Sequence, residues 1–535
     1  MKYIFLILFV IDLQAQNHSY FSIIPDLGAI DDKCYLDAVT YDSNYIYILG
    51  SLLTSQDSNG RNKVWDIYLS KFDYHGKLIA KTIFPDSSDG IPYIDANYPM
   101  IKINDSLYFY SWNLHEYPPQ NNSDYEAFII DIKNAKIIRK KRIPRPFPGD
   151  YYFIHYCKAF FHNGKVNLMF ETNPNDTIDI HYYMYEIDTS LNNFKIDSIG
   201  RFNQKLTFYW VSKNQKNEYE FVGEVSKIKN GEITSEMNLF YMKMDSTFKI
   251  IKRKDYLGNF NYGFVTADNY TILRNEDNTW VMSAYDWVIT KEPDPNYGKP
   301  TTLKFSPEFD SLIWKRSMYE KPVDVKLMNS WIYYADKMKD GSGYITAGDQ
   351  YDQRVGGREN YAVLYKVSEN GDSLWTRKYI PLGWTKERTV GTGMSQVKVS
   401  DFNTIIMGGI AGDRDQNYAV RAWLLHLDSD GCLVPGCNTV ISTNDIISKK
   451  DKAFVVYPNP SNSGKIYLLS RISSNEKYNL SLLNLQGIEI YKSEFLPMEG
   501  AQYFIEIPEK IKPGEYILQI KNKSNVQIEK LLMVK

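Results

Sequence analysis

The residues whose types and spacing could support catalysis are few in this sequence. His155 and Cys157 stand two apart and would share one face of a strand, as a base and a nucleophile or two metal ligands would. No third group accompanies them, so the simpler interpretation is a pair of packed side chains. The sequence contains no nucleophile elbow, no HExxH and no phosphate-binding glycine loop. Carboxylates are plentiful, so an acid/base pair stays open.

One segment has the spacing of a calcium loop. Asp413, Asp415 and Asn417 alternate in GDRDQNYA, but Tyr418 stands where such a loop needs glycine for its sharp turn. We therefore expect no metal site and no cofactor.

Two of the four cysteines lie close together. Cys432 and Cys437 flank a Pro-Gly turn in GCLVPGC, which could bring the two sulfurs together. A local disulfide is the interpretation we favour. A metal pair is the alternative, although no second ligand pair has a useful spacing. The spacing of Cys34 and Cys157 does not decide whether they are free or paired.

The composition excludes several classes of protein. The 535 residues include 62 Lys+Arg and 64 Asp+Glu, for a net charge of -2, and 43% are hydrophobic. This balance argues against a nucleic-acid binder and against a protein held on a membrane by basic patches. The hydrophobic content argues against disorder. Aromatic residues make up 15%, which favours strands.

A unit of about 59 residues recurs along most of the chain. Each copy has an alternating apolar strand, a polar loop, a second strand ending in a polar turn, and a third strand, as in YIYILGS, VWDIYLSKFD and LIAKTIF. Another short alternating segment precedes each copy, such as YLDAVTYD (35–42) or VKVSDFN (397–403). The residues that open the polar turns recur at intervals of 57 to 62 residues: Asp73, Asp131, Asp188, Asp245, Ser306, Ser368 and Asp428.

Four strands repeated seven times predict an all-β fold, a seven-bladed β-propeller over residues 16–438. A β-solenoid would have a shorter period and a string of sandwiches a longer one. The last unit lacks an outer strand, so we expect FSIIPD (21–26) to complete it and remove an exposed edge.

Two copies carry a tryptophan in the fourth strand. The segment GDSLWTR, with Trp375, resembles the glycine-and-tryptophan docking pattern of quinoprotein-type propellers, and we expect both Trp314 and Trp375 to pack one blade on the next. The segment SENGDSLW also resembles the aspartate box of sialidases, but Asn370 occupies the place of its Asp, and Gly371 and Asp372 are out of order.

The propeller topology directs attention to one rim of the ring. Loops between second and third strands, and connections between blades, emerge together, and here they are long and varied. Variable loops on a rigid scaffold tend to hold ligands, and aromatic residues with arginine typify binding hot spots. We predict ligand-binding residues there, with channel sealing as the alternative: Trp112, His115, Tyr117, Trp287, Tyr297, Arg354, Arg358, Trp384 and Arg388.

The N-terminus has the order of an export signal. One lysine, an apolar run from Ile4 to Ile11 and a small residue at Ala15 predict a signal peptide over 1–15. That run is too short to span a bilayer, and no later stretch approaches 18 apolar residues, so we expect no transmembrane segment.

The composition shifts after a linker over 439–450. Residues 451–535 have alternating strands broken by turn residues, which predicts a small immunoglobulin-like β-sandwich. The order and spacing of its motifs resemble the type A C-terminal sorting domain of the type IX secretion system, largely confined to Bacteroidetes. Leu485 and Glu515 depart from the usual pattern without disturbing the turns. The resemblance rests on Tyr457, Pro458, Asn459, Pro460, Gly487, Pro513, Gly514, Tyr516 and the terminal strand through Lys535.

This resemblance implies an export route. The signal delivers the chain to the periplasm, the outer-membrane translocon recognises the sorting domain, and a surface sortase removes it. The cargo is then attached to surface polysaccharide or released. We expect a secreted or cell-surface protein whose propeller binds a glycan or protein without catalysis. The alternatives are a polysaccharide-active hydrolase or lyase with carboxylates at the channel, and a structural surface-layer component.

Overall fold

The computed structural model divides into two compact units, Met1–Leu433 and Val434–Lys535. The predicted signal peptide and linker lie outside the described residues. The structure describes residues 20–29, 33–56, 63–84, 91–92, 100–115, 123–143, 153–173, 181–202, 204, 206–229, 232–256, 272–288, 297–318, 328–352, 359–381, 384, 388–416, 419–433, 453–457, 465–484, 488–498, 501–506, 514–522 and 526–533.

The described part of the first unit forms seven antiparallel sheets. The first three contain β2 (Cys34–Tyr41), β3 (Tyr45–Gln56), β4 (Lys63–Asp73) and β5 (Leu78–Phe84); β6 (Ile91–Pro92), β7 (Ile101–Lys102), β8 (Leu107–His115), β9 (Ser123–Asp131) and β10 (Lys136–Ile143); and β11 (Phe153–His162), β12 (Lys165–Asn173), β13 (His181–Asp188) and β14 (Phe194–Arg201). The next two contain β15 (Leu206–Lys213), β16 (Tyr219–Lys229), β17 (Glu232–Met244) and β18 (Ile250–Tyr256); and β19 (Ile272–Arg274), β20 (Trp280–Val288), β21 (Tyr297–Phe305) and β22 (Leu312–Ser317). The last two contain β23 (Met328–Lys337), β24 (Tyr344–Asp352), β25 (Glu359–Val367) and β26 (Ser373–Tyr379); and β27 (Thr389–Val399), β28 (Ile405–Asp413), β29 (Ala419–Leu427) and β1 (Phe21–Ile23).

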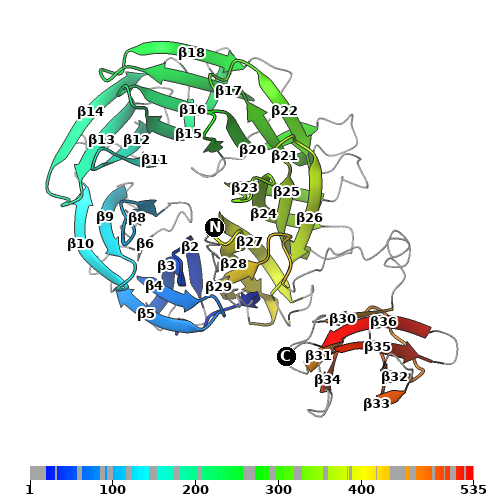
Figure 1. Cartoon of the computed structure of the whole chain (residues 1–535). Coiled ribbons are helices and arrows are strands. Elements are labelled where there is room, and N and C mark those ends of the chain that lie inside the picture. Colours follow the sequence, from blue (N-terminus) through cyan, green and yellow to red (C-terminus); the bar gives the residue numbers. More distant parts are fainter. Residues whose placement is uncertain are drawn as a thin grey trace, which may run out of the picture. The chain divides into compact units, whose positions relative to one another are not determined.

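These sheets follow one another around a ring, with their early strands inside and their fourth strands outside (Figure 1). This arrangement is a β-propeller, as the sequence predicts. Burial decreases outward: β3 is buried over most of its length, whereas β10 is largely exposed. Hydrophobic clusters lie between neighbouring sheets, and one joins Ile345 and Leu364 to Met407 and Leu425.

The N-terminal strand completes the last sheet, as predicted. Phe21 pairs with His426 and Ile23 with Leu424, so β1 covers the outer edge of β29. The indole N–H of Trp423 donates to Ser22 Oγ at 2.9 Å.

The strand predicted at 397–403 was placed too late in the chain, because residues 400–404 make the β27–β28 turn and Asn403 has a φ of 60°.

The periodic turn residues occupy one structural position. Asp73, Asp245 and Asp428 each accept hydrogen bonds from two backbone N–H groups of their own turn, and Ser368 does the same through Oγ. Three residues after the opening residue the chain adopts a positive φ in six of the turns, at Gly76, Leu191, Phe248, Phe309, Gly371 and Gly431.

The predicted docking of tryptophans on the next blade is confirmed. A Cβ at Gly371 would lie 2.8 Å from Trp314 atoms, and one at Gly431 would lie 2.7 Å from Trp375. The indole N–H of Trp314 also donates to Glu369 O at 3.0 Å. Each ring therefore covers a turn that only glycine leaves open.

Glycine also recurs where the innermost strands bulge. The register of β2, β15 and β27 shifts by one residue near the middle of each strand. Gly50, Gly223 and Gly409 face these bulges, and a Cβ there would lie 2.0 to 2.1 Å from a carbonyl oxygen of the innermost strand. The close backbone approach accordingly requires glycine.

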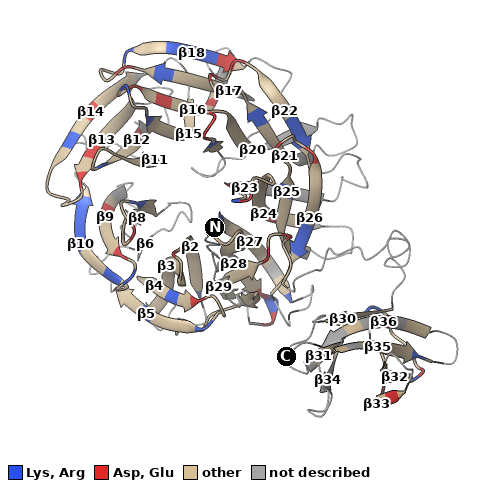
Figure 2. Ribbon diagram, in the orientation of Figure 1, with Lys and Arg blue, Asp and Glu red and all other residues tan. Residues whose placement is uncertain are grey.

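Lysine and arginine concentrate on the outermost strands (Figure 2). Many of them reach the next blade. Lys254 donates to Asp310 O at 2.8 Å and Arg139 to Thr189 O at 2.6 Å, each in a turn of the next blade. Lys81 instead donates to Leu27 O at 2.9 Å, in the segment between β1 and β2. Charged outer strands also protect the sheet edges from pairing with another chain.

The second unit has two sheets that share one hydrophobic core. The first contains β30 (Phe454–Tyr457), β31 (Lys465–Ser470) and β34 (Gln502–Glu506), and the second β33 (Glu489–Phe495), β32 (Tyr478–Leu483), β35 (Gly514–Lys521) and β36 (Val526–Met533). Phe454 and Leu468 from one sheet pack with Leu480, Leu518 and Leu531 from the other.

The docking glycines allow a matched test of blade packing. Gly371→Ala and Gly341→Ala both place a side chain at a positive φ, of 87° and 72°, which costs about 1 kcal/mol in each case. Only Gly371→Ala meets a tryptophan, since Gly341 has nothing within 4 Å. We expect Gly371→Ala to lose a further 1–3 kcal/mol or so in urea unfolding. Equal losses in the two variants would contradict this packing role.

Candidate functional site

The predicted rim residues fall into three groups. Trp112 and His115 lie on β8, Trp287 on β20, and Tyr297 begins β21, all toward the ends of strands that lead into or out of second-to-third strand loops. Trp384 and Arg388 lie in the connection that precedes β27. Tyr117, Arg354 and Arg358 lie outside the described residues. A ligand site on this rim therefore stays a prediction.

On this rim, Arg388 contacts Trp384 and a buried carboxylate. The Arg388 guanidinium lies 4.5 Å from the Trp384 ring centroid. It also binds both carboxylate oxygens of Asp413, at 2.8 and 2.5 Å. Asp413 is fully buried, and its hydrogen bonds with Arg388 lower the pKa of its carboxyl. Asp413, the first of the residues with calcium-loop spacing, thus neutralises an arginine.

This ion pair predicts a pH-dependent loss of stability. A carboxyl whose folded pKa is lowered contributes stability above its unfolded pKa, and the contribution is lost as the pH falls through the folded pKa. Arg388→Gln should cost about 2 kcal/mol at pH 7, less than a fully buried pair because Arg388 is 28% exposed. The cost should shrink toward pH 3 in thermal unfolding. Arg414→Gln, at the adjacent exposed arginine, is the control, and an effect independent of pH would contradict the assignment.

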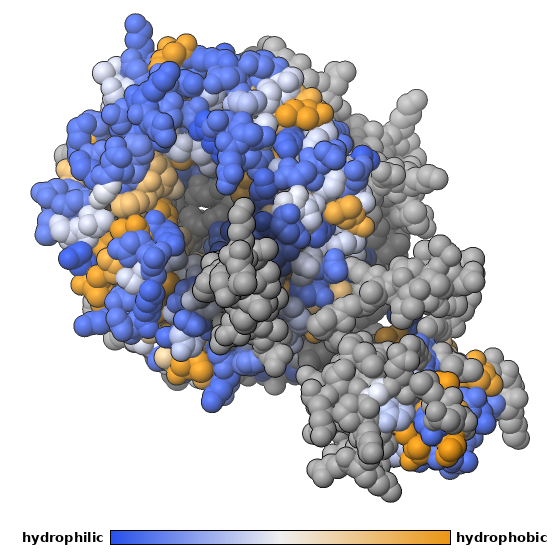
Figure 3. Space-filling view, viewed as in Figure 1, coloured by the Kyte–Doolittle hydropathy of each residue, from blue (hydrophilic) through white to orange (hydrophobic). Residues whose placement is uncertain are grey.

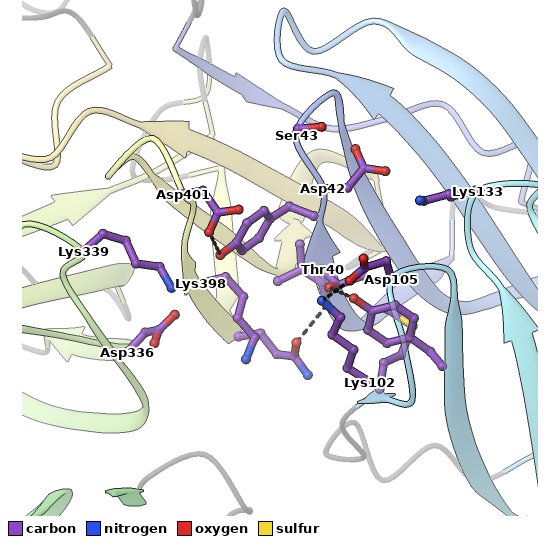
Figure 4. Close-up of a pocket in the computed structure, with 15 residues that line it drawn as sticks. Thr40, Asp42, Ser43, Lys102, Asp105, Lys133, Asp336, Lys339, Lys398 and Asp401 are labelled. Atoms are coloured by element: carbon purple, nitrogen blue, oxygen red, sulfur yellow. Dashed lines mark hydrogen bonds and ion pairs between the residues drawn. The ribbon is translucent and has the colours of Figure 1, made fainter. Parts of the chain in front are cut away.

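A pocket of about 650 Å³ lies on the opposite rim, where the first-to-second and third-to-fourth strand turns emerge (Figure 4). Four sheets contribute to it: the first, the second, the sixth and the seventh. Its lining is Val39, Thr40, Tyr41, Asp42, Ser43, Met100, Lys102, Asp105, Tyr108, Lys133, Asp336, Lys339, Gln396, Lys398 and Asp401. The volume is in the range of small-molecule sites.

Hydrogen bonds between the first and the seventh sheet build the floor. Gln396 Oε1 accepts the N–H of Val39 at 2.8 Å, and its Nε2 donates to Asp37 O at 3.0 Å. The Tyr41 hydroxyl donates to Val399 O at 2.8 Å and lies 3.3 Å from Asp401 Oδ1. Burial, and then the charge of Asp401, raise the pKa of Tyr41. The phenol therefore stays a hydrogen-bond donor at neutral pH.

The aspartates and lysines of the pocket differ in the hydrogen bonds and ion pairs that they form within the protein. Asp42 accepts two backbone N–H groups and the Tyr47 hydroxyl, and Asp336 accepts two backbone N–H groups. Lys102 and Asp105 pair at 2.9 Å, and the hydrogen bond from Lys102 lowers the pKa of Asp105. Lys133 and Lys339 form no ion pair with any described residue.

A buried carboxyl lies on the same innermost strand as the floor. Asp37 stands at the β2 bulge, is 1% exposed, and its Oδ1 has no hydrogen-bond partner among the described residues. Burial raises the pKa of Asp37 to about 8. Its carboxyl is therefore mainly protonated at neutral pH.

Removing this ionisable group should stabilise the ring at high pH. A carboxyl with a raised folded pKa costs stability above its unfolded value near 3.8, and the cost grows until about pH 8. Asp37→Asn should gain on the order of 2 kcal/mol at pH 8 and little at pH 4, as measured by thermal unfolding. Asp105→Asn, whose carboxyl has a lowered pKa, should show no such gain. A flat pH profile for Asp37→Asn would refute the raised pKa.

The pocket was not predicted from the sequence. Its aspartates stand in or beside short turns, where Asp is an ordinary residue, so their positions give no sign of a binding site. Tyr41 and Val399 are 358 positions apart. No local spacing could bring them together.

The remaining site predictions have mixed outcomes. Cys432 is buried and disulfide-bonded, but Cys437 lies outside the described residues, so their pairing stays a prediction. Cys34 is a buried thiol whose sulfur accepts the Ala422 N–H. The side chains of His155 and Cys157 are not described. Within the described residues, no three His, Cys, Asp or Glu side chains cluster as a metal site would require.

Three of the sorting-motif residues lie on described strands of the second unit. Tyr457 ends β30, pairs with Tyr467 and stacks on its ring at 5.7 Å. Gly514 begins β35, and Tyr516 on the same strand pairs with Leu531. Pro458, Asn459, Pro460, Gly487, Pro513 and Lys535 lie outside the described residues.

The fold and these motifs define the class: an all-β protein with a β-propeller and a separate C-terminal β-unit. Residues 455–535 match the family model described as a secretion system C-terminal sorting domain. This unit is a type IX secretion sorting domain, so the protein is secreted or attached to the cell surface and is recognised by the type IX machinery. None of the described segments is a helix with the length and hydropathy to span a membrane.

Comparison with solved structures returns β-propellers at low similarity. The Dos1 propeller is 9% identical, with 76% of this chain and 94% of that chain covered and a TM-score of 0.37. The propeller domain of the Trilobed protease from Pyrococcus furiosus is 9% identical, with 77% and 98% covered and a TM-score of 0.36. Trypanosoma rangeli sialidase with the inhibitor DANA is 6% identical, with 93% and 84% covered and a TM-score of 0.38. No curated protein matches the chain.

Proposed function

We propose that this protein is an exported ligand-binding module that performs no catalysis on its ligand, a glycan or a protein. In this proposal a signal peptide over 1–15 precedes a seven-bladed propeller over 16–438. A linker over 439–450 then leads to an immunoglobulin-like sorting domain over 451–535. A surface sortase removes this domain, and the propeller is attached to surface polysaccharide or released.

The observation that carries the proposal is the polar pocket formed by turns of four sheets. Backbone hydrogen bonds hold Asp42 and Asp336, and Gln396 joins two of the sheets beneath the pocket. The site is therefore largely preformed, which lowers the entropic cost of binding. The visible face of the ring is mostly hydrophilic, with separate hydrophobic groups (Figure 3). A polar ligand suits such a surface better than an apolar one.

The alternative is a polysaccharide-active hydrolase or lyase, which would need two acids facing one substrate. Asp37 has the raised pKa of a general acid, but it is 1% exposed. The pKa of Asp428 is also raised by burial, yet this carboxylate accepts two backbone N–H groups of its own turn. Both carboxyls are buried and belong to different sheets, so they do not present an acid pair to a substrate. Binding is therefore the better-supported function. The nine rim residues from Trp112 to Arg388 remain a second proposed contact surface.

A blocking substitution tests the proposal. The full chain is screened against oligosaccharides and proteins for binding, with mass spectrometry of each saccharide for products. We expect saturable binding without products, reduced at least tenfold by Ser43→Trp, because Ser43 lines the pocket. Ser311→Trp changes an equally exposed turn serine of the ring and should bind as wild type does. Product formation would establish the enzyme instead, and binding unaffected by Ser43→Trp would move the site elsewhere.

A further inference from the structure

We propose that the polar pocket on the short-turn rim selects an acidic saccharide, a chain of hydroxyl-rich sugars carrying carboxylates. This inference rests on the proposed binding function and specifies its ligand. Its basis is the contrast between two aspartates that are hydrogen-bonded within the protein and two exposed lysines, Lys133 and Lys339, that form no ion pair with described residues.

Two of the four aspartates that line the pocket hold parts of the protein together. Asp42 accepts the N–H groups of Asn44 and Tyr45 at 2.8 and 2.9 Å, and its second oxygen accepts the Tyr47 hydroxyl at 2.7 Å. Asp336 binds the N–H of Val399 at 2.8 Å, which joins the sixth sheet to the seventh. Because these donors stabilise the negative charges, the two groups repel an incoming anion less than exposed aspartates would.

Two lysine ammonium groups of the pocket are exposed and can contact a ligand. Lys133 and Lys339 are exposed, line the pocket and form no ion pair with described residues. Figure 4 shows them on opposite sides of the pocket, with Lys398 between them. Lys102 is paired with Asp105, but both are exposed, at 58% and 88%, so this pair is readily exchanged. Cations spaced across a cavity favour an extended ligand with more than one acidic group.

The rest of the lining favours sugars over an acidic peptide. Thr40, Tyr41, Ser43 and Tyr108 present hydroxyl groups, and Asp401 offers acceptor oxygens for the hydroxyls of a sugar. The apolar lining is small, with Val39 and Met100 as its aliphatic members. A peptide would find little apolar surface for its side chains, whereas a saccharide uses donors and acceptors together.

The test compares ligands that differ only in charge. Isothermal titration of the full chain uses trigalacturonate and neutral galactotriose at 50 and 500 mM NaCl. We expect trigalacturonate to bind at least tenfold more tightly at low salt, with the advantage reduced at high salt by screening. Lys133→Gln/Lys339→Gln should remove the advantage and leave the neutral ligand unchanged. Lys216→Gln/Lys249→Gln removes two exposed turn lysines outside the pocket and should behave as wild type.

The outcomes separate the ligand class from the binding function. Equal affinity for both sugars, with Ser43→Trp still abolishing binding, would overturn the acidic specificity and leave the binding site standing. Tighter binding of a hexaglutamate peptide than of trigalacturonate would also overturn the saccharide assignment. Absence of binding by both sugars would overturn it as well, and the wider ligand screen would then decide the binding function separately.

Discussion

The pairing of β1 with β29 is the constraint on which the rest of the ring depends. It joins residues some four hundred positions apart in sequence and covers the last exposed edge of the seventh sheet. On the inner side of the same junction β27 lies beside β2, and Gln396 bridges the two strands. The pocket floor is built on that bridge. Ring closure therefore also brings together the two strands that form the pocket floor.

Contacts between neighbouring blades distribute the same constraint around the ring. A fourth-strand tryptophan covers the glycine in the next turn at two junctions, and outer-strand cations reach turn carbonyls of the next blade at two others. Each contact uses backbone groups that every turn presents. The blades can thus diverge in sequence while the turn geometry persists. This explains why the turn residues repeat so regularly while the strands between them resemble one another weakly.

The two rims of the ring differ in sequence character, and both are candidates for the ligand-binding site. The long-loop rim is rich in aromatic residues and arginine, and the described pair there, Trp384 and Arg388, is held by Asp413. The short-turn rim has ordinary turn residues, yet four of its sheets converge on a polar pocket. In the short turns, hydrogen bonds within the turn fix side chains such as Asp42. The export route is independent of this choice, since it depends on the C-terminal unit.

Local patterns in the sequence determined the strands, the turn period, the outer strand donated by the N-terminus and the docking tryptophans. Each of these depends on residues close in the chain or on an unpaired edge that must be covered. The tertiary structure alone decided which turns meet. Tyr41, Lys133, Asp336 and Lys398 share a pocket because ring closure brings four sheets together, and no spacing along the chain encodes that proximity. The burial that raises the pKa of Asp37 likewise arises only when the neighbouring sheets exclude water.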